Sequence, residues 1–194
     1  MASTKNVKGA AVLNNGFNNT FAGGDGVALF GNDGAGNTTH PTLAGTFRNQ
    51  PAVAADCNET SLEQAMIDIS ALTDERGLKI AARGTKMIVP PQLQFVADRL
   101  LNTEGRTGTA DNDINAIKNM GMVSGGYVVN HYLTDPDAWF VKTDVPNGLK
   151  HFSRSPIKTT MEGDFDTGNV RYKARERYVF GFSDPRGIYG NPGA

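Results

Sequence analysis

Residues 85–101, TKMIVPPQLQFVADRLL, carry the clearest local pattern in the chain. KMIV is a short apolar run that predicts a strand over 86–89. A proline suits the first turn of a helix, so Pro90-Pro91 predicts the corner where the strand gives way to a helix. The apolar positions after this corner follow helical spacing: Leu93, Val96, Ala97, Leu100 and Leu101.

A second helix is predicted just before this unit, over residues 61–76. Thr60 to Glu63 has the T-x-x-E form of a capping box, and Gly77 is suited to end the helix in a left-handed backbone conformation. One apolar stripe runs along the helix: Leu62, Ala65, Met66, Ile69 and Leu72.

Shorter elements surround these two units. Helical spacing predicts a helix over residues 4–15. A short helix is expected from an Asp113 cap to Gly121. Two apolar runs flank an Asp-Pro-Asp turn further on, which predicts a hairpin over 126–142 with His131 inside its first strand.

A longer hairpin is predicted near the C-terminal end, with its turn at residues 167–168. This register places Glu162 opposite Lys173 and Asp164 opposite Arg171, and such acid–base pairs contribute about 0.2–1 kcal/mol each. The alternate residues form an apolar face that we expect to point toward a core: Phe165, Val170, Tyr172, Ala174, Tyr178, Phe180 and Phe182.

Arg175 and Arg177 are the candidate assembly-interface residues. The same register places them opposite Thr160 and Lys158, so neither has an acidic partner across the hairpin. Two interpretations stay open with equal weight. The pair forms salt bridges with another subunit, or both side chains are solvated.

Composition narrows the classes of function. The 194 residues include 39% hydrophobic and 20% charged residues, which is ordinary for a globular protein. The net charge is −1, without the basic excess of a dedicated nucleic-acid binder. No apolar run approaches the length of a membrane span. The single cysteine, Cys57, cannot form an internal disulfide, and we expect it to be buried.

No motif indicates catalysis or metal binding. His40, His131 and His151 are isolated in the sequence, without Cys, Asp or Glu at metal-ligand spacing. The sequence contains no G-x-S-x-G nucleophile elbow and no P-loop. We therefore expect no cofactor, no metal and no enzymatic activity.

Four segments in a fixed order resemble tailed-bacteriophage major capsid proteins. They are TKNVKGAAVLNNGF with GGDGVALF, then ETSLEQAMIDISALTDERG with TKMIVPPQLQFVADRLL, then YLTDPDAWFVKTD, and last ARERYVFGFSDPRGIYG. The resemblance covers nearly all of the chain and corresponds to the C-terminal part of the family's subunit. No single motif is diagnostic, but the order of the segments is specific.

The resemblance implies an α+β fold shared with phage heads and encapsulins. Residues 1–60 and 148–194 would form a peripheral domain that carries the long β-hairpin. Residues 61–147 would form an inserted α/β axial domain.

The resemblance also implies a function. The chain would be a structural subunit that forms hexamers and pentamers of an icosahedral capsid around double-stranded DNA. Its partners would be itself, scaffold and portal proteins and, without sequence specificity, the packaged DNA. It would not bind a membrane.

The implied location is the virion capsid, and the bacterial cytoplasm during assembly. An encapsulin-type nanocompartment shell is the alternative. A hydrolase or maturation protease is less favoured, because it needs a Ser–His constellation and the sequence shows none. We expect this chain by itself to form monomers or small capsomers.

Overall fold

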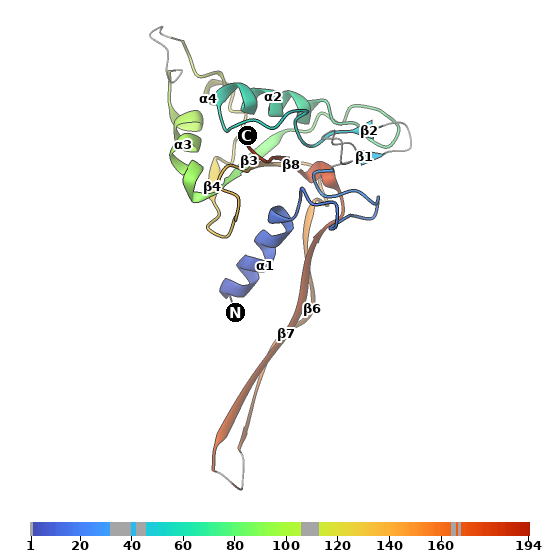
Figure 1. Ribbon diagram of the computed structural model, residues 1–194, viewed down its shortest axis with the longest axis vertical. Helices are drawn as coiled ribbons and strands as arrows, with labels where there is room; N and C mark the ends of the chain where they lie inside the picture. Colours follow the sequence, from blue (N-terminus) through green and yellow to red (C-terminus); the bar gives the residue numbers. More distant parts are fainter. Residues whose placement is uncertain (1, 32–39, 42–45, 106–112, 164–165, 167) are drawn as a thin grey trace.

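The computed structural model describes residues 2–31, 40–41, 46–105, 113–163, 166 and 168–194. Its elements form a body from which a long two-stranded ribbon projects (Figure 1). In chain order they are α1 (Ala2–Asn14), β1 (His40–Pro41), β2 (Thr46–Phe47), α2 (Glu59–Ser70), β3 (Gly84–Val89), η1 (Pro91–Leu93), α3 (Gln94–Asn102), α4 (Ala116–Asn119), β4 (Tyr127–Val129), β5 (Trp139–Thr143), β6 (Leu149–Gly163), β7 (Val170–Phe182), η2 (Pro185–Gly187) and β8 (Ile188–Asn191).

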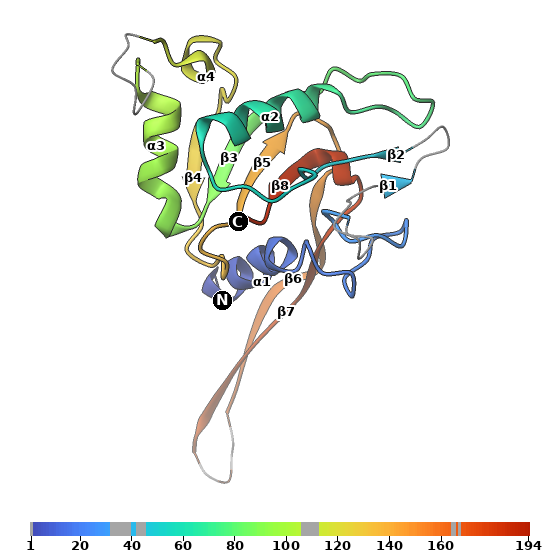
Figure 2. The same ribbon diagram turned by 45° about the horizontal axis from the view of Figure 1, so that its top comes forward.

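A four-stranded sheet in the order β4-β3-β5-β8 organises the body. β3 runs parallel to β4 and antiparallel to β5, which in turn pairs antiparallel with β8. Helix α2 crosses one side of this sheet and α1 lies on the other (Figure 2). The mixture of helices and a largely antiparallel sheet confirms the α+β class.

The two faces of the sheet are buried in two different cores. Odd-numbered strand residues, such as Met87, Val141 and Tyr189, pack with the apolar stripes of α2 and α3. Even-numbered residues, such as Phe140 and Ile188, pack with residues of α1 and of the loop that follows it. Successive strand residues point to opposite faces, so an uninterrupted apolar strand suits a sheet covered on both sides.

The strand–helix unit at Pro90-Pro91 is confirmed. β3 ends at Val89, a single 3-10 turn begins at Pro91, and α3 continues from Gln94. The predicted stripe of this helix faces the first core, with Ala97, Leu100 and Leu101 buried and the other members partly buried.

The bounds and cap predicted for α2 are wrong, although its apolar stripe is buried as expected. The cap is Asn58, whose side-chain oxygen accepts a hydrogen bond from the Ser61 amide at 2.8 Å, while the Ser61 hydroxyl accepts one from the Asn58 amide. Asparagine forms this reciprocal cap as well as threonine does, and it begins the helix two residues earlier. The helix ends at Ser70, and Gly77 (φ +81°) belongs to a separate turn.

The predicted hairpin over 126–142 is also wrong. β4 and β5 do not pair with each other, because β3 lies between them. β3 is a central strand, buried on both faces, and it pairs with a neighbour along each edge. The turn residues between two strands in the sequence do not show that a third strand lies between them. His131 lies in a turn after β4 and is exposed. The short helix α4 is capped by Asn115 rather than Asp113.

Cys57 is buried in the first core, as predicted. Burial, followed by the nearby Asp56 carboxylate, raises the pKa of its thiol to about 12. Among the described residues, no helix combines the length and the apolar character needed to cross a membrane.

Phe30 anchors the second core. Its ring lies 4.6 Å from that of Phe17 and 5.3 Å from that of Phe140, between centroids. Gly16 and Gly190 flank the same ring, and a Cβ atom at either position would lie 2.6 Å from it. The ring is fully buried, so a methyl group added beside it would overpack the core.

We therefore expect Gly190→Ala to lower the free energy of unfolding by about 1–3 kcal/mol, the usual cost of overpacking. Urea denaturation measures this. Gly181→Ala is the matched control, because a Cβ there has no heavy atom within 4 Å. An equal effect of both substitutions would contradict the packing argument.

Candidate assembly surface

Among the described residues, strands β6 and β7 pair only with each other, and they form a projecting arm (Figure 1). Their pairing begins with Leu149 opposite Phe182 at the body and reaches Gly163 opposite Val170 near the tip. The register shifts twice between Ser153 and Lys158, so the ribbon contains irregularities in its middle. Such irregularities increase the local twist of a ribbon.

The predicted register of this hairpin is wrong by two residues. Glu162 pairs with Arg171 instead of Lys173, and Lys173 faces Thr160. The reason is the connection between the strands, which is longer than a two-residue turn. A shift by an even number leaves each side chain on its predicted face. Asp164 and Phe165 lie outside the described residues.

The apolar face points toward a core only near the body. Tyr178, Phe180 and Phe182 are partly buried, as expected. Val170, Tyr172 and Ala174, further along the same face, are exposed, so the prediction is wrong for them. The body is too short to reach the distal half of the arm, as Figure 1 shows.

Helix α1 covers the proximal half of this face. Lys5 forms an ion pair with Glu176, and the ammonium groups of Lys5 and Lys8 each lie 5.3 Å from the centroid of the Tyr178 ring. Gly9 lies directly over Phe180. The coverage therefore combines close helix packing with cation–π contacts.

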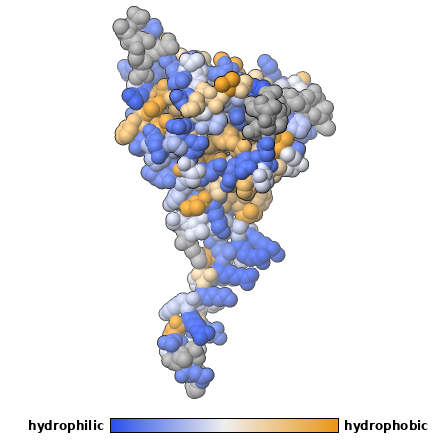
Figure 3. Space-filling view, viewed as in Figure 1, coloured by the Kyte–Doolittle hydropathy of each residue, from blue (hydrophilic) through white to orange (hydrophobic). Residues whose placement is uncertain are grey.

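The opposite face carries the candidate residues Arg175 and Arg177. In the observed register Arg175 faces Lys158 and Arg177 faces Ser155. Within the described part of the chain, neither guanidinium has an ion pair. Lys173 extends the row, and alternate strand residues are about 7 Å apart. The result is a row of positive charges along one side of a thin ribbon, where hydrophilic residues dominate the arm in Figure 3.

The arm is fixed to the body at its root. The Ser183 and Asp184 amides donate to the carbonyls of Gly148 and Asn147, each at 3.1 Å. Gly148 and Gly187 meet so closely that a side chain on either would collide with the backbone of the other. The two glycines therefore allow the chain to enter and leave the arm at a single point.

Arg186 fixes this root to the segment of the body that follows α2. Its guanidinium binds both carboxylate oxygens of Asp184, with Nε–Oδ1 at 2.9 Å and Nη2–Oδ2 at 2.8 Å. It also donates to the Thr73 carbonyl at 3.0 Å and lies over the Phe47 ring. The hydrogen bond to Asp184 raises the pKa of Arg186.

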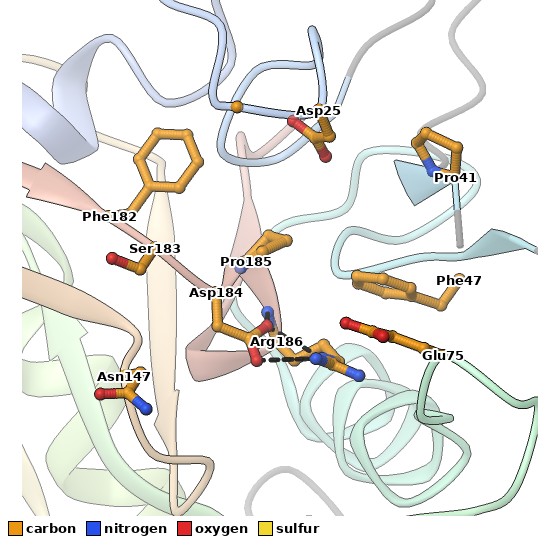
Figure 4. Close-up of a pocket in the computed structure, with 11 residues that line it drawn as sticks. Asp25, Pro41, Phe47, Glu75, Asn147, Phe182, Ser183, Asp184, Pro185 and Arg186 are labelled. Atoms are coloured by element: carbon orange, nitrogen blue, oxygen red, sulfur yellow. Dashed lines mark hydrogen bonds and ion pairs between the residues drawn. The ribbon is translucent and has the colours of Figure 1, made fainter. Parts of the chain in front are cut away.

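A pocket of about 720 Å³ opens beside this root (Figure 4). The Asp184–Arg186 pair forms part of its wall, and Asp25 and Glu75 contribute further carboxylates. Sequence reasoning missed the root altogether. The contacts of residues 184–187 with residues 73 and 147 depend on the fold, which no local pattern records.

The three histidines do not converge. His40 is fully buried, with Nδ1 2.8 Å from the Asp25 carboxylate and its ring stacked on Phe47. His151 stacks on Phe180 in the arm, and His131 is exposed. Among the described residues, no three His, Cys, Asp or Glu side chains form a group that could hold a metal ion.

A mixed α+β body with a projecting arm, charged along one face and apolar along the other, indicates a protein that acts through its surface. The sequence matches the family described as "Phage capsid protein" over residues 1–191, and the chain belongs to this family. The predicted resemblance to phage capsid proteins is thereby confirmed. Membership identifies the chain as a structural protein of the capsid, and so of the virion.

One similar solved structure is the virus-like particle from Pyrococcus furiosus. The match has a TM-score of 0.45 and 13% identity, and it covers 74% of this chain and 55% of that chain. The chain thus spans little more than half the length of that relative. No curated protein matches the sequence.

We expect Arg186→Lys to loosen the root of the arm, because lysine cannot reproduce the bidentate contact. The free energy of unfolding should fall by about 1.5–3 kcal/mol, the range for hydrogen bonds to charged groups. Limited proteolysis should cut first between residues 183 and 187. Arg83→Lys is the control, since the Arg83 side chain is exposed. Equal protease resistance of both variants would contradict this role.

Proposed function

We propose that this chain is a structural subunit of an icosahedral bacteriophage capsid, which forms hexamers and pentamers and encloses double-stranded DNA. The observation that carries the proposal is membership of the phage capsid protein family over residues 1–191. Scaffold and portal proteins are the further partners of such a subunit. Assembly takes place in the bacterial cytoplasm, and the subunit has no enzymatic activity.

The proposed division of the chain agrees with this role. Residues 61–147 supply most of α2, all of α3 and α4 and three of the four strands of the sheet, and we assign them to the axial domain. Residues 1–60 and 148–194 supply α1 and the arm, and they correspond to the peripheral domain. β8 joins the two parts by pairing with β5.

Charge supports the arm as a contact between subunits. Residues 149–182 contain seven Lys or Arg and four Asp or Glu, a net charge of +3. The other 160 residues contain twelve basic and sixteen acidic residues, a net charge of −4. The arm of one copy is therefore attracted to the body of another.

Such a contact would stabilise Arg175 more than the other basic residues of the arm. It lies directly opposite Lys158, and like charges in this position destabilise a strand pair. A carboxylate from a neighbouring subunit would relieve that repulsion. We assign Arg175 and Arg177 to an intersubunit interface for this reason.

Electron microscopy and sedimentation velocity test the proposed assembly. Purified protein should associate with increasing concentration into rings of five or six copies, or into shells of uniform size. A discrete monomer that cleaves a peptide reporter would contradict the proposal.

We expect Arg175→Glu/Arg177→Glu to weaken this association by about tenfold or more, the effect of losing 1.4 kcal/mol. Sedimentation velocity at about 0.05 and 0.5 M salt measures it, because salt screens exposed charges. Wild-type association should weaken as salt rises, and association of the variant should not.

Lys79→Glu/Lys86→Glu is the matched control. It changes the net charge by the same amount at two exposed residues of the body. If both double variants weaken association equally, net charge alone is responsible, and the assignment of Arg175 and Arg177 is wrong.

A further inference from the structure

The sequence contains two Asn-Gly bonds, Asn15-Gly16 and Asn147-Gly148. Asparagine is one of the chemically labile residues of proteins. Before glycine its side chain can react with the main chain, because glycine has no Cβ to keep the two groups apart. The first bond follows α1 directly, and the second lies at the root of the arm, between β5 and β6.

Both reacting groups are engaged at Asn15. Its side-chain amide donates to the Ala11 carbonyl at 2.8 Å, and the Gly16 amide donates to the Leu13 carbonyl at 3.0 Å. Gly16 is buried against the Phe30 ring. The side chain and the nitrogen that would attack it are therefore both held by hydrogen bonds of the helix end.

Asn147 lacks these restraints. Its side chain is exposed, and among the described residues it has no hydrogen-bond partner. No acceptor in the described part of the chain lies in hydrogen-bond geometry with the Gly148 amide. Asn147 also lines the pocket at the root of the arm (Figure 4). The side chain and the attacking nitrogen are thus available together where water reaches them.

We infer that Asn147 is a site of spontaneous covalent modification, at which the Asn-Gly bond rearranges through a cyclic imide to aspartate and isoaspartate. The Gly148 nitrogen loses its proton and attacks Cγ of Asn147. A new C–N bond closes the ring, the Cγ–Nδ2 bond breaks, and the amide group takes up the proton and leaves as ammonia.

Water then opens the imide at either carbonyl. Breaking the new bond gives aspartate on the original main chain. Breaking the original peptide bond gives isoaspartate, whose main chain runs through Cγ and contains an additional carbon atom. Either product exchanges a neutral amide for a carboxylate.

Isoaspartate lengthens the main chain where the root has least room. The Asn147 carbonyl accepts a hydrogen bond from the Asp184 amide, and the next carbonyl accepts one from the Ser183 amide, each at 3.1 Å. A Cβ atom on Gly148 would already lie 2.9 Å from Cα of Gly187. The additional atom displaces Gly148 from these contacts and loosens the root. This reaction goes beyond the proposed function and does not depend on association between subunits.

Peptide mapping by mass spectrometry tests the site. The folded chain is incubated at neutral and at mildly alkaline pH and digested at intervals. The Asn147 peptide should gain the mass difference between a carboxyl and an amide at least about tenfold faster than the Asn15 peptide, which corresponds to about 1.4 kcal/mol in activation free energy. The rate should rise with pH, because the attacking nitrogen must lose its proton. Methylation by an isoaspartyl methyltransferase identifies isoaspartate.

No conversion at Asn147, or equal rates at the two sites of the folded chain, would overturn the inference. The same incubation in urea is the control. Unfolding removes the hydrogen bonds at Asn15, so the two rates should then become similar. An Asn15 that stays slow in the unfolded chain would overturn the structural basis of the difference.

Substitution tests the effect on the root. Asn147→Gly removes the reacting amide and suits the left-handed backbone at this position (φ +63°). After incubation, limited proteolysis should cut the aged wild-type chain between residues 183 and 187 several-fold faster than the fresh chain. The aged Asn147→Gly variant should be cut no faster than the fresh one.

Asn147→Asp is the matched control, because it carries the charge of the product on a main chain of ordinary length. Fresh Asn147→Asp should resist the protease better than aged wild-type protein. Equal ageing of wild type and Asn147→Gly, or equal cleavage of fresh Asn147→Asp and aged wild type, would overturn the loosening of the root by isoaspartate.

Discussion

The structure depends on the burial of both faces of its four-stranded sheet. Odd-numbered residues of β3, β5 and β8 enter one core and even-numbered residues enter the other. A sheet buried on both sides needs a covering layer on each side, and these layers come from distant parts of the chain. α2 and α3 supply the first layer, and α1 with the segment around Phe30 supplies the second. The two ends of the chain are thus held against its middle.

The position of the arm follows from this arrangement. β5 and β8 are neighbours in the sheet, and the chain between them leaves the body as β6 and returns as β7. The close approach of Gly148 and Gly187 and the Asp184–Arg186 pair hold the crossing point. The sheet therefore fixes where the arm begins, while its length places the tip beyond the reach of the body. A surface left uncovered in this way is suited to contacts between subunits.

The two faces of the arm carry different chemistry because side chains alternate along each strand. One face bears Lys158, Lys173, Arg175 and Arg177, and the other bears Met161, Val170 and Tyr172. Long-range attraction between charges favours encounter, whereas apolar burial stabilises a contact once it has formed.

The sequence by itself determined the elements and the faces of the strands and helices. The Pro90-Pro91 corner, the stripe of α2 and the alternation along β7 depend on local spacing, which the backbone geometry of a helix or strand sets directly. The ordered resemblance also identified the family. Pairing was decided by the tertiary structure. β3 separates β4 from β5, and the arm pairs two residues away from the predicted register, because these choices depend on burial and on loop length. The exposure of Tyr172 and Val170 likewise followed from where the body ends, which no local pattern records.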